Sequence, residues 1–339
     1  MTTLLTPAYR LVIGKHRVDT TVEPKASAST DLLVTLDIDA LPDTAALTLG
    51  QVGGIAPALE DTATIELGYA DNGGLTQVFT GTVDLFDASL LTRRVAATST
   101  ARALMRLFVD KSYEGQSAGE IVRDLAGRAK IDTGAIDDGI RFPVYVIESR
   151  KNALAHIREL AALCGVDAYV DAMGKLVFQA FTQGRVIHDV DYAKQVLSLE
   201  VDRLANADVS VKAFGESPVA QAGSDAWGWL TKNFSPMAGS AGDGPLPVLV
   251  ERASLRTSSA AATAASATLR AVQRRAVHGS VRMPGRPEVS LGDALRVRDV
   301  PLDGFNDTYQ VRRVVHRITK AEGFVTTVDF AAIPSEALK

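Results

Sequence analysis

The sequence is short of cysteine and of long apolar runs, and each shortage excludes a class of protein. A single cysteine, Cys164, stands among 339 residues, so neither an internal disulfide nor a cysteine-based zinc cluster can form. No apolar run approaches the roughly 18 to 20 residues that cross a bilayer, and the N-terminus lacks a basic segment followed by an apolar stretch. We therefore expect folding in a reducing cytoplasm, without export or membrane anchoring.

Motifs that carry chemistry are also missing. The sequence has no phosphate-binding GxxxxGK[ST], no strand-linked GxGxxG and no GxSxG elbow, and its five histidines do not stand at metal-ligand spacing: His16, His156, His188, His278 and His316. His156, opposite the apolar stripe of its helix, and His316, on a strand, are interpreted as structural. The adjacent Asp137 and Asp138 fall in a polar turn, where nothing separates their pKa values into an acid and a base. We expect no enzyme, no cofactor and no metal site.

The composition that is present is that of an ordinary folded protein. Apolar residues make up 46% and charged residues 22%, and the length suggests two domains or one elaborated fold. The net charge of -4 hides a segregation: residues 1–250 hold 22 basic against 31 acidic residues, and residues 251–320 hold 13 against 6. Few aromatics accompany these arginines, which disfavours nucleic acid and favours a solvated face or a subunit contact. Arg270, Arg274 and Arg275 are candidate contact residues, and replacing Arg274 and Arg275 by Glu is predicted to weaken trimer formation.

Strands dominate the first hundred residues. Alternating apolar and polar residues predict strands at Tyr9–Ile13, Leu32–Ile38, Thr64–Tyr69 and Val78–Leu85. The segment Tyr69-Ala-Asp-Asn-Gly-Gly74 predicts a hairpin that joins the last two, because Asn and Gly tolerate positive φ. Repeated hairpins indicate an antiparallel barrel or sandwich.

A helical unit interrupts the strands. Ala101–Val109 is a short helix candidate, and Ser117–Lys130 is a firmer one, with capping-box spacing between Ser117 and Glu120. Apolar residues at three and four spacing predict another helix between Ser149 and Gly165, with Cys164 in its buried stripe as a packing residue. A strand hairpin is expected in 167–181.

The remaining chain returns to strands at 195–201, 207–214, 279–282, 294–298, 309–319 and 323–330, with an Ala-rich helix at 257–276. The loop 215–245 separates these parts and carries Trp227, Trp229 and Phe234 as candidate partner-docking residues. We predict an α+β, β-rich fold with two antiparallel β-barrel-like domains. Its parts are 1–110, a first barrel; 111–190, an insertion of two helices and a hairpin; and 191–339, a second barrel.

Local patterns in this order resemble a known family. They are Phe79-Thr-Gly-Thr-Val-Asp84; Tyr113-Glu-Gly-Gln-Ser117 followed by Ile121 and Leu125; Glu148-Ser149 with Leu154 and Gly165; Gly174-Lys-Leu-Val-Phe178; and a closing run of Gly285-Arg-Pro287, Leu291-Gly-Asp293, Tyr309-Gln-Val311, Val315-His316 and Gly323-Phe-Val-Thr326. This set is similar to the tail hub proteins of contractile phages and injection systems, namely the phage late control D family, the hub portion of VgrG and the T4-type baseplate hub. The loop 215–245 has no counterpart in that pattern.

The resemblance implies a non-enzymatic structural hub. Its expected form is a homotrimeric ring, assembled in the bacterial cytoplasm and built into the baseplate of a virion tail or injection particle. Its expected partners are the hexameric tail tube, the trimeric spike and other baseplate proteins.

Two alternatives from other classes stay open. One is a cell-wall hydrolase with its site on the long loop, which turnover of peptidoglycan by the purified protein would reveal. The other is an adaptor that binds effector cargo through Trp227, Trp229 and Phe234. Deletion of residues 220–240 would then leave particles assembled but empty.

Overall fold

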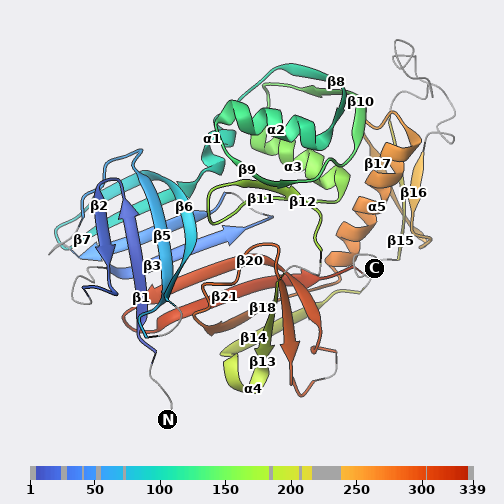
Figure 1. Ribbon diagram of the computed structural model, residues 1–339. Helices are drawn as coiled ribbons and strands as arrows, with labels where there is room; N and C mark the ends of the chain where they lie inside the picture. Colours follow the sequence, from blue (N-terminus) through green and yellow to red (C-terminus); the bar gives the residue numbers. More distant parts are fainter. Residues whose placement is uncertain are drawn as a thin grey trace.

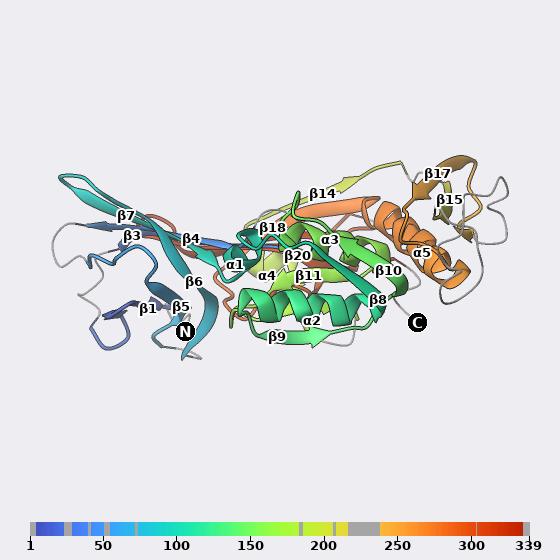
Figure 2. The same cartoon turned by 90° about the horizontal axis from the view of Figure 1, so that it is seen from above.

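The computed structural model (Figure 1) describes residues 5–23, 29–39, 42–50, 55–71, 74–182, 186–205, 208–215, 238–302 and 304–334. The molecule is elongated, with the N-terminal strands at one end and α5 at the other (Figure 2). A long antiparallel sheet runs along the molecule. The helices α1, α2 and α3 lie over its middle, and α5 lies at the end opposite the N-terminal strands.

The N-terminal strands form as the alternation predicts. β5 and β6 pair in antiparallel fashion, with Ile65 opposite Phe79, so the predicted hairpin is confirmed. Along β5 the buried residues Ala63, Ile65 and Leu67 alternate with more exposed ones, as expected for a strand with one face on a core. The strands of this part are β1 (Pro7–Ile13), β2 (His16–Asp19), β3 (Ser29–Asp37), β4 (Thr44–Gly50), β5 (Thr62–Tyr69), β6 (Gly74–Ala88) and β7 (Thr92–Ser99).

The middle of the chain contains the predicted helices. Ser117 caps α2 in a complete capping box with Glu120, and Gly165 ends α3 at φ 69°. α3 begins later than predicted, because the Asn152 side chain accepts from the Ala155 amide and sets the first turn there. The elements are α1 (Ala101–Met105), β8 (Lys111–Ser117), α2 (Ala118–Ala129), β9 (Thr133–Ile136), β10 (Arg141–Ile147), α3 (Ala153–Cys164), β11 (Asp167–Val170) and β12 (Leu176–Gln179).

The last part alternates strands with two helices. The predicted Ala-rich helix is α5, capped by the Thr257 side chain. The elements are β13 (Ile187–Asp191), α4 (Tyr192–Gln195), β14 (Ser198–Arg203), β15 (Val209–Phe214), β16 (Gly239–Ala241), β17 (Leu246–Glu251), α5 (Ser258–Arg274), β18 (Val277–Pro284), β19 (Ala294–Arg298), β20 (Thr308–Thr319) and β21 (Gly323–Ala332).

A single sheet of 13 strands unites the two predicted strand regions. Its main path runs β14-β18-β21-β20-β3-β4-β7-β6-β5-β1-β2, and β3 pairs with β20 in antiparallel fashion, Val34 lying opposite His316. The β-rich fold and its large antiparallel sheet are confirmed. Smaller sheets pair β8 with β10, β9 and β11 with β12, and β16 and β17 with β15. No closed barrel is found among the described strands, and the two strand regions predicted as separate barrels share the 13-stranded sheet. The sequence missed this because a pairing between strands so far apart leaves no local signal.

Two hydrophobic cores lie along the molecule. The first is shared by the N-terminal strands and the C-terminal ones, and includes Leu11, Val34, Phe79, Val314 and Phe330. The second combines α2 and α3 with β15 and with the alanines that α5 buries. The second core therefore joins residues of the predicted insertion to residues of the predicted third domain.

The capping box of α2 gives a direct test of the local structure. Ser117→Ala removes the oxygen that accepts from the Glu120 amide at 3.1 Å, and we expect the free energy of unfolding to fall by about 1 kcal/mol. Urea unfolding followed by circular dichroism measures it. Ser258→Ala, at an exposed position that begins α5, is the matched control and should change little. An equal fall in the free energy of unfolding in both variants would contradict the capping role of Ser117.

Candidate assembly site

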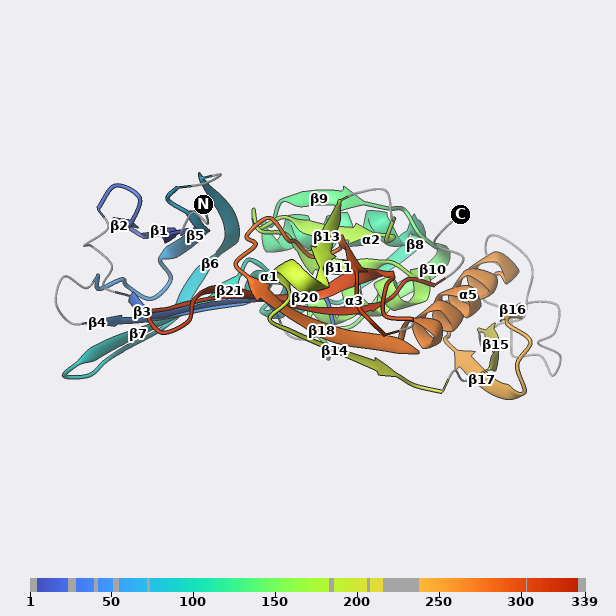
Figure 3. The same ribbon diagram turned by 90° about the horizontal axis from the view of Figure 1, so that it is seen from below.

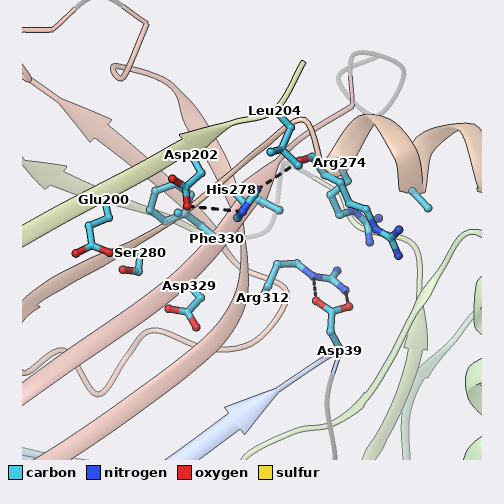
Figure 4. Close-up of a pocket in the computed structure, with 14 residues that line it drawn as sticks. Asp39, Glu200, Asp202, Leu204, Arg274, His278, Ser280, Arg312, Asp329 and Phe330 are labelled. Carbon is cyan, nitrogen blue, oxygen red and sulfur yellow. Dashed lines mark hydrogen bonds and ion pairs between the residues drawn. The ribbon is translucent and has the colours of Figure 1, made fainter. Parts of the chain in front are cut away.

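An open groove of about 800 Å³ lies between the C-terminal end of α5 and the sheet formed by β14, β18 and β21. Figure 4 shows its charged lining. β14 contributes Glu200 and Asp202, and α5 contributes Arg274 and Arg275. Arg312 of β20, with Asp39 beside it, also lines the groove. Acidic and basic groups thus face each other across one depression.

A buried carboxylate, outside the groove lining itself, holds two of the arginines that line it. Asp167, at the start of β11, is 5% exposed and accepts from Arg312 Nη1 at 2.7 Å and from Gln310 Nε2 at 2.6 Å. Arg274 Nη1 lies 3.5 Å from the same carboxylate. Arg312 donates from Nε to Asp39 Oδ2 at 2.9 Å, and its Nη2 bonds the other oxygen (Figure 4). One ion network therefore joins strands of the long sheet to β11 and α5.

The pKa values in this network follow from burial and pairing. Burial would raise the pKa of Asp167, but the facing Arg312 and Arg274 outweigh it and hold that pKa below its ordinary value. Burial lowers the pKa of Arg274, and Asp167 opposes that effect. Burial also acts to lower the pKa of Arg312, yet its two carboxylate partners raise it. The network is therefore one of charges, because arginine is not deprotonated in proteins and the lowered pKa of Asp167 favours its carboxylate.

Ion pairs also run along the junction between β3 and β20. Arg317 Nη2 lies 3.0 Å from Asp31 Oδ2, and Arg313 Nε lies 3.6 Å from Asp37 Oδ2. With the Arg312–Asp39 pair, three arginines of the basic segment are matched by three acids of the first forty residues. The segregation of charge along the sequence is therefore partly neutralised inside the fold, and these arginines do not form a free patch. The sequence counts had suggested such a patch because pairing across 286 residues is invisible to them.

The Leu291-Gly-Asp293 motif has a structural explanation. Asp293 Oδ2 accepts from the Ser290 amide at 3.0 Å and lies 2.9 Å from His188 Nε2, a buried pair that ties the turn before β19 to β13. Gly292 has φ 79°, and a Cβ there would come within 2.8 Å of the Tyr169 hydroxyl oxygen. Only glycine fits this close approach.

The other groups that the sequence analysis considered for chemistry are also placed by the structure. Over the described residues, no three His, Cys, Asp or Glu side chains gather so as to hold a metal ion. Burial raises the pKa of the Cys164 thiol to about 11, and its Sγ accepts from the Ile140 amide at 3.3 Å. Cys164 is a packing residue, as predicted. No helix within the described ranges is long and apolar enough to cross a membrane.

The candidate contact residues of α5 have three different surroundings. Arg274 takes part in the network around Asp167, Arg275 is exposed at the rim of the groove, and Arg270 lies beside Gly165. The candidate docking residues Trp227, Trp229 and Phe234 lie outside the described residues. The part of loop 215–245 that the structure describes forms β16 and the approach to β17.

Two histidines are structural, but one is placed differently from its prediction. His156 was expected opposite the apolar stripe of α3, yet it is 3% exposed, with Nε2 3.0 Å from the Glu148 carbonyl oxygen. The chain before α3 folds back over that side of the helix. His316 is fully buried on β20, with Nδ1 3.0 Å from Thr326 Oγ1.

The sequence analysis missed Asp39, Asp167 and Arg312. The strand β20 has a register shift between Val311 and Arg313, and the run Tyr309–Arg312 is buried throughout. Such a bulge turns an extra residue toward the interior. The signal that was present is the adjacent pair Arg312 and Arg313, which breaks the alternation of the strand.

Similarity to known proteins is found in the structure and not in the sequence. No protein family and no curated protein sequence matches the chain. The 43 kDa tail protein of prophage MuSo2 from Shewanella oneidensis matches with a TM-score of 0.73 at 15% identity, over 98% of this chain and 100% of that one. A tail protein from Neisseria meningitidis matches with a TM-score of 0.71 at 12% identity, over 96% and 97% of the two chains.

A third likeness reaches a secretion system. An E. coli component of the type VI secretion system, described as structurally similar to the T4 bacteriophage tail proteins gp27 and gp5, matches with a TM-score of 0.61 at 11% identity. The match covers 91% of this chain and 74% of that one. The chain therefore has the fold of these phage tail proteins. The component of the type VI secretion system has a similar fold.

The buried carboxylate should matter far more to stability than its exposed counterpart. Asp167→Asn removes a buried charge and leaves Arg312 and Arg274 without their shared partner, so the free energy of unfolding should fall by about 3 kcal/mol. Asp39→Asn is the matched control, because the Asp39 side chain is 66% exposed and its pair should contribute about 1 kcal/mol or less. Urea unfolding compares them, and equal losses would refute the central role of Asp167.

The buried His316 predicts a pH dependence. Burial lowers its pKa to about 4, so between the ordinary value near 6.5 and 4 the unfolded chain binds a proton that the folded chain does not. This group should therefore lower stability as pH falls through that window, by about 1.4 kcal/mol per pH unit. His316→Gln should remove that loss. The difference in unfolding free energy between the two proteins is measured at pH 7 and at pH 4.5, and a constant difference would contradict the prediction.

Proposed function

We propose that this chain is the structural hub of a contractile phage tail or of a phage-tail-like injection system. In this role it forms a homotrimer that joins the hexameric tail tube to the trimeric spike. One observation carries the proposal: the fold matches a prophage tail protein over 98% of this chain and 100% of that one. A match of this extent leaves no large part of either chain unaccounted for.

The architecture supports a protein that connects a hexameric assembly to a trimeric one. Each chain presents two groups of antiparallel strands, β1–β7 and β18–β21, along one sheet. Three chains in a ring would present six such groups, which suits contact with a hexameric tube on one side and with a trimer on the other. The likeness to a type VI secretion component, of which 74% is covered, supports the same class of machine.

The groove supports a role in assembly more than one in catalysis. The best-buried arginine of its lining, Arg312, is paired with Asp167 behind the groove, and this pair joins parts of the fold. The exposed charges at its rim remain for contacts with other chains. Stacking of rings requires shape and matched surfaces.

The mass of the purified protein tests the oligomer. Three copies of 36.0 kDa give about 108 kDa, and native mass spectrometry or light scattering should find that species. Arg275→Glu should weaken the trimer, because Arg275 is exposed at the end of α5, where its charge can meet a neighbouring subunit. Lys320→Glu is the control, an exposed cation in the turn between β20 and β21.

Three results separate the outcomes. A wild-type monomer at micromolar concentration would contradict the trimer. Equal weakening by both variants would remove Arg275 from the subunit contact but leave the trimer standing. Complete tails in a producing strain that lacks this chain would contradict the hub role itself.

A further inference from the structure

The strand β14 leaves one edge of the long sheet open. Among the described strands it pairs with β18 alone, and it is drawn at the margin of the molecule in Figure 3. An edge strand presents unpaired amide and carbonyl groups that an added strand can bond. β14 is six residues long and contains no proline, which would remove an amide from the edge, and its charged residues are Glu200, Asp202 and Arg203. Such charges select which strand can be added.

The apolar side of β14 is incompletely covered. Leu199 and Val201 pack against the first core but are only partly buried. Leu197, just before the strand and on the same side, is 56% exposed. An added strand with apolar residues on this side would remove that surface from water.

The other side of β14 is acidic. Glu200 and Asp202 point toward the groove (Figure 4). The Asp202 side chain is 74% exposed, and its Oδ2 lies 3.7 Å from His278 Nε2. Arg275 stands across the groove, on α5. Two carboxylates on alternate residues of an open edge are thus left to solvent.

These carboxylates disfavour a second copy of β14 as the added strand. If two copies paired in antiparallel fashion about Val201, Glu200 of one would lie opposite Asp202 of the other. Like charges directly opposite each other destabilise a strand pair. A strand with cations at alternate positions would instead place opposite charges beside Glu200 and Asp202, which stabilises a strand pair.

We propose that β14 and the adjoining groove bind an extended basic segment of another protein by strand addition. Lysine or arginine side chains at alternate positions of that segment reach Glu200 and Asp202. Apolar side chains at the positions between them cover Leu199 and Val201, because successive side chains of a strand point to opposite faces. The inference does not rest on the hub role, since it concerns one surface of a single chain.

A labelled peptide of alternating lysine and valine, six residues long, is the probe. Fluorescence anisotropy at physiological salt should show saturable binding to the wild-type protein. The double variant Glu200→Gln with Asp202→Asn should weaken it about tenfold or more, since two charge-assisted contacts are lost. The double variant Asp87→Asn with Glu114→Gln neutralises two exposed carboxylates elsewhere and should bind like wild type.

A second peptide separates strand addition from simple charge attraction. The same sequence with alternate backbone amides methylated keeps its charge but cannot form one row of hydrogen bonds, and it should lose binding. Equal binding of both peptides, or equal weakening by both double variants, would overturn the proposal. So would self-association of the wild-type chain that disappears in the Glu200 and Asp202 variant, because a second copy would then occupy the edge.

Discussion

The carboxylate of Asp167 is the group on which the joining of the two cores depends. It lies on β11, beside the second core, and it is held by Arg312 from the long sheet and by Arg274 from α5. A buried charge without partners destabilises a protein strongly, so any docking of the second core that separates these groups is disfavoured. The network therefore fixes how the parts meet more than it adds to their stability, and Asp39 extends the same constraint to the end of β3.

Local structure could be predicted from the sequence to the extent that its signals are local. The capping residues of α2, the left-handed Gly165 and the pairing of β5 with β6 depend on signals within a few residues, and each lies where the pattern placed it. The pairing of β3 with β20 is different, because it joins segments nearly the whole chain apart and both read as ordinary half-buried strands. Strand groups separated by helices led to the prediction of two barrels. The pairing of β3 with β20 instead places both groups in the same 13-stranded sheet.

The candidate site could be predicted only in outline. The arginines of α5 and the unequal charge of the two segments are legible in the sequence, and Arg274 and Arg275 do line the groove. The sequence did not indicate the other members of the ion network, Asp167 and Arg312. Asp167 follows a helix as the polar first residue of the expected strand hairpin, which does not indicate burial, whereas Arg312 is turned inward by a bulge that breaks the alternation. His156 shows the same limit, since a helix face that looks polar is buried when another segment folds over it.

The place of β3 in the middle of the sheet also sets an order of events in the cell. Asp39 and Arg312 are separated by 273 residues. At roughly 5 to 20 residues per second, a ribosome needs about 14 to 55 s to advance from one to the other. Throughout that time β3 has an open edge, and Asp31 and Asp37 face water in place of the arginines that later pair with them. Charged side chains on an open edge disfavour pairing with another chain. The carboxylates that join the finished sheet are thus of the kind that protects an unfinished one.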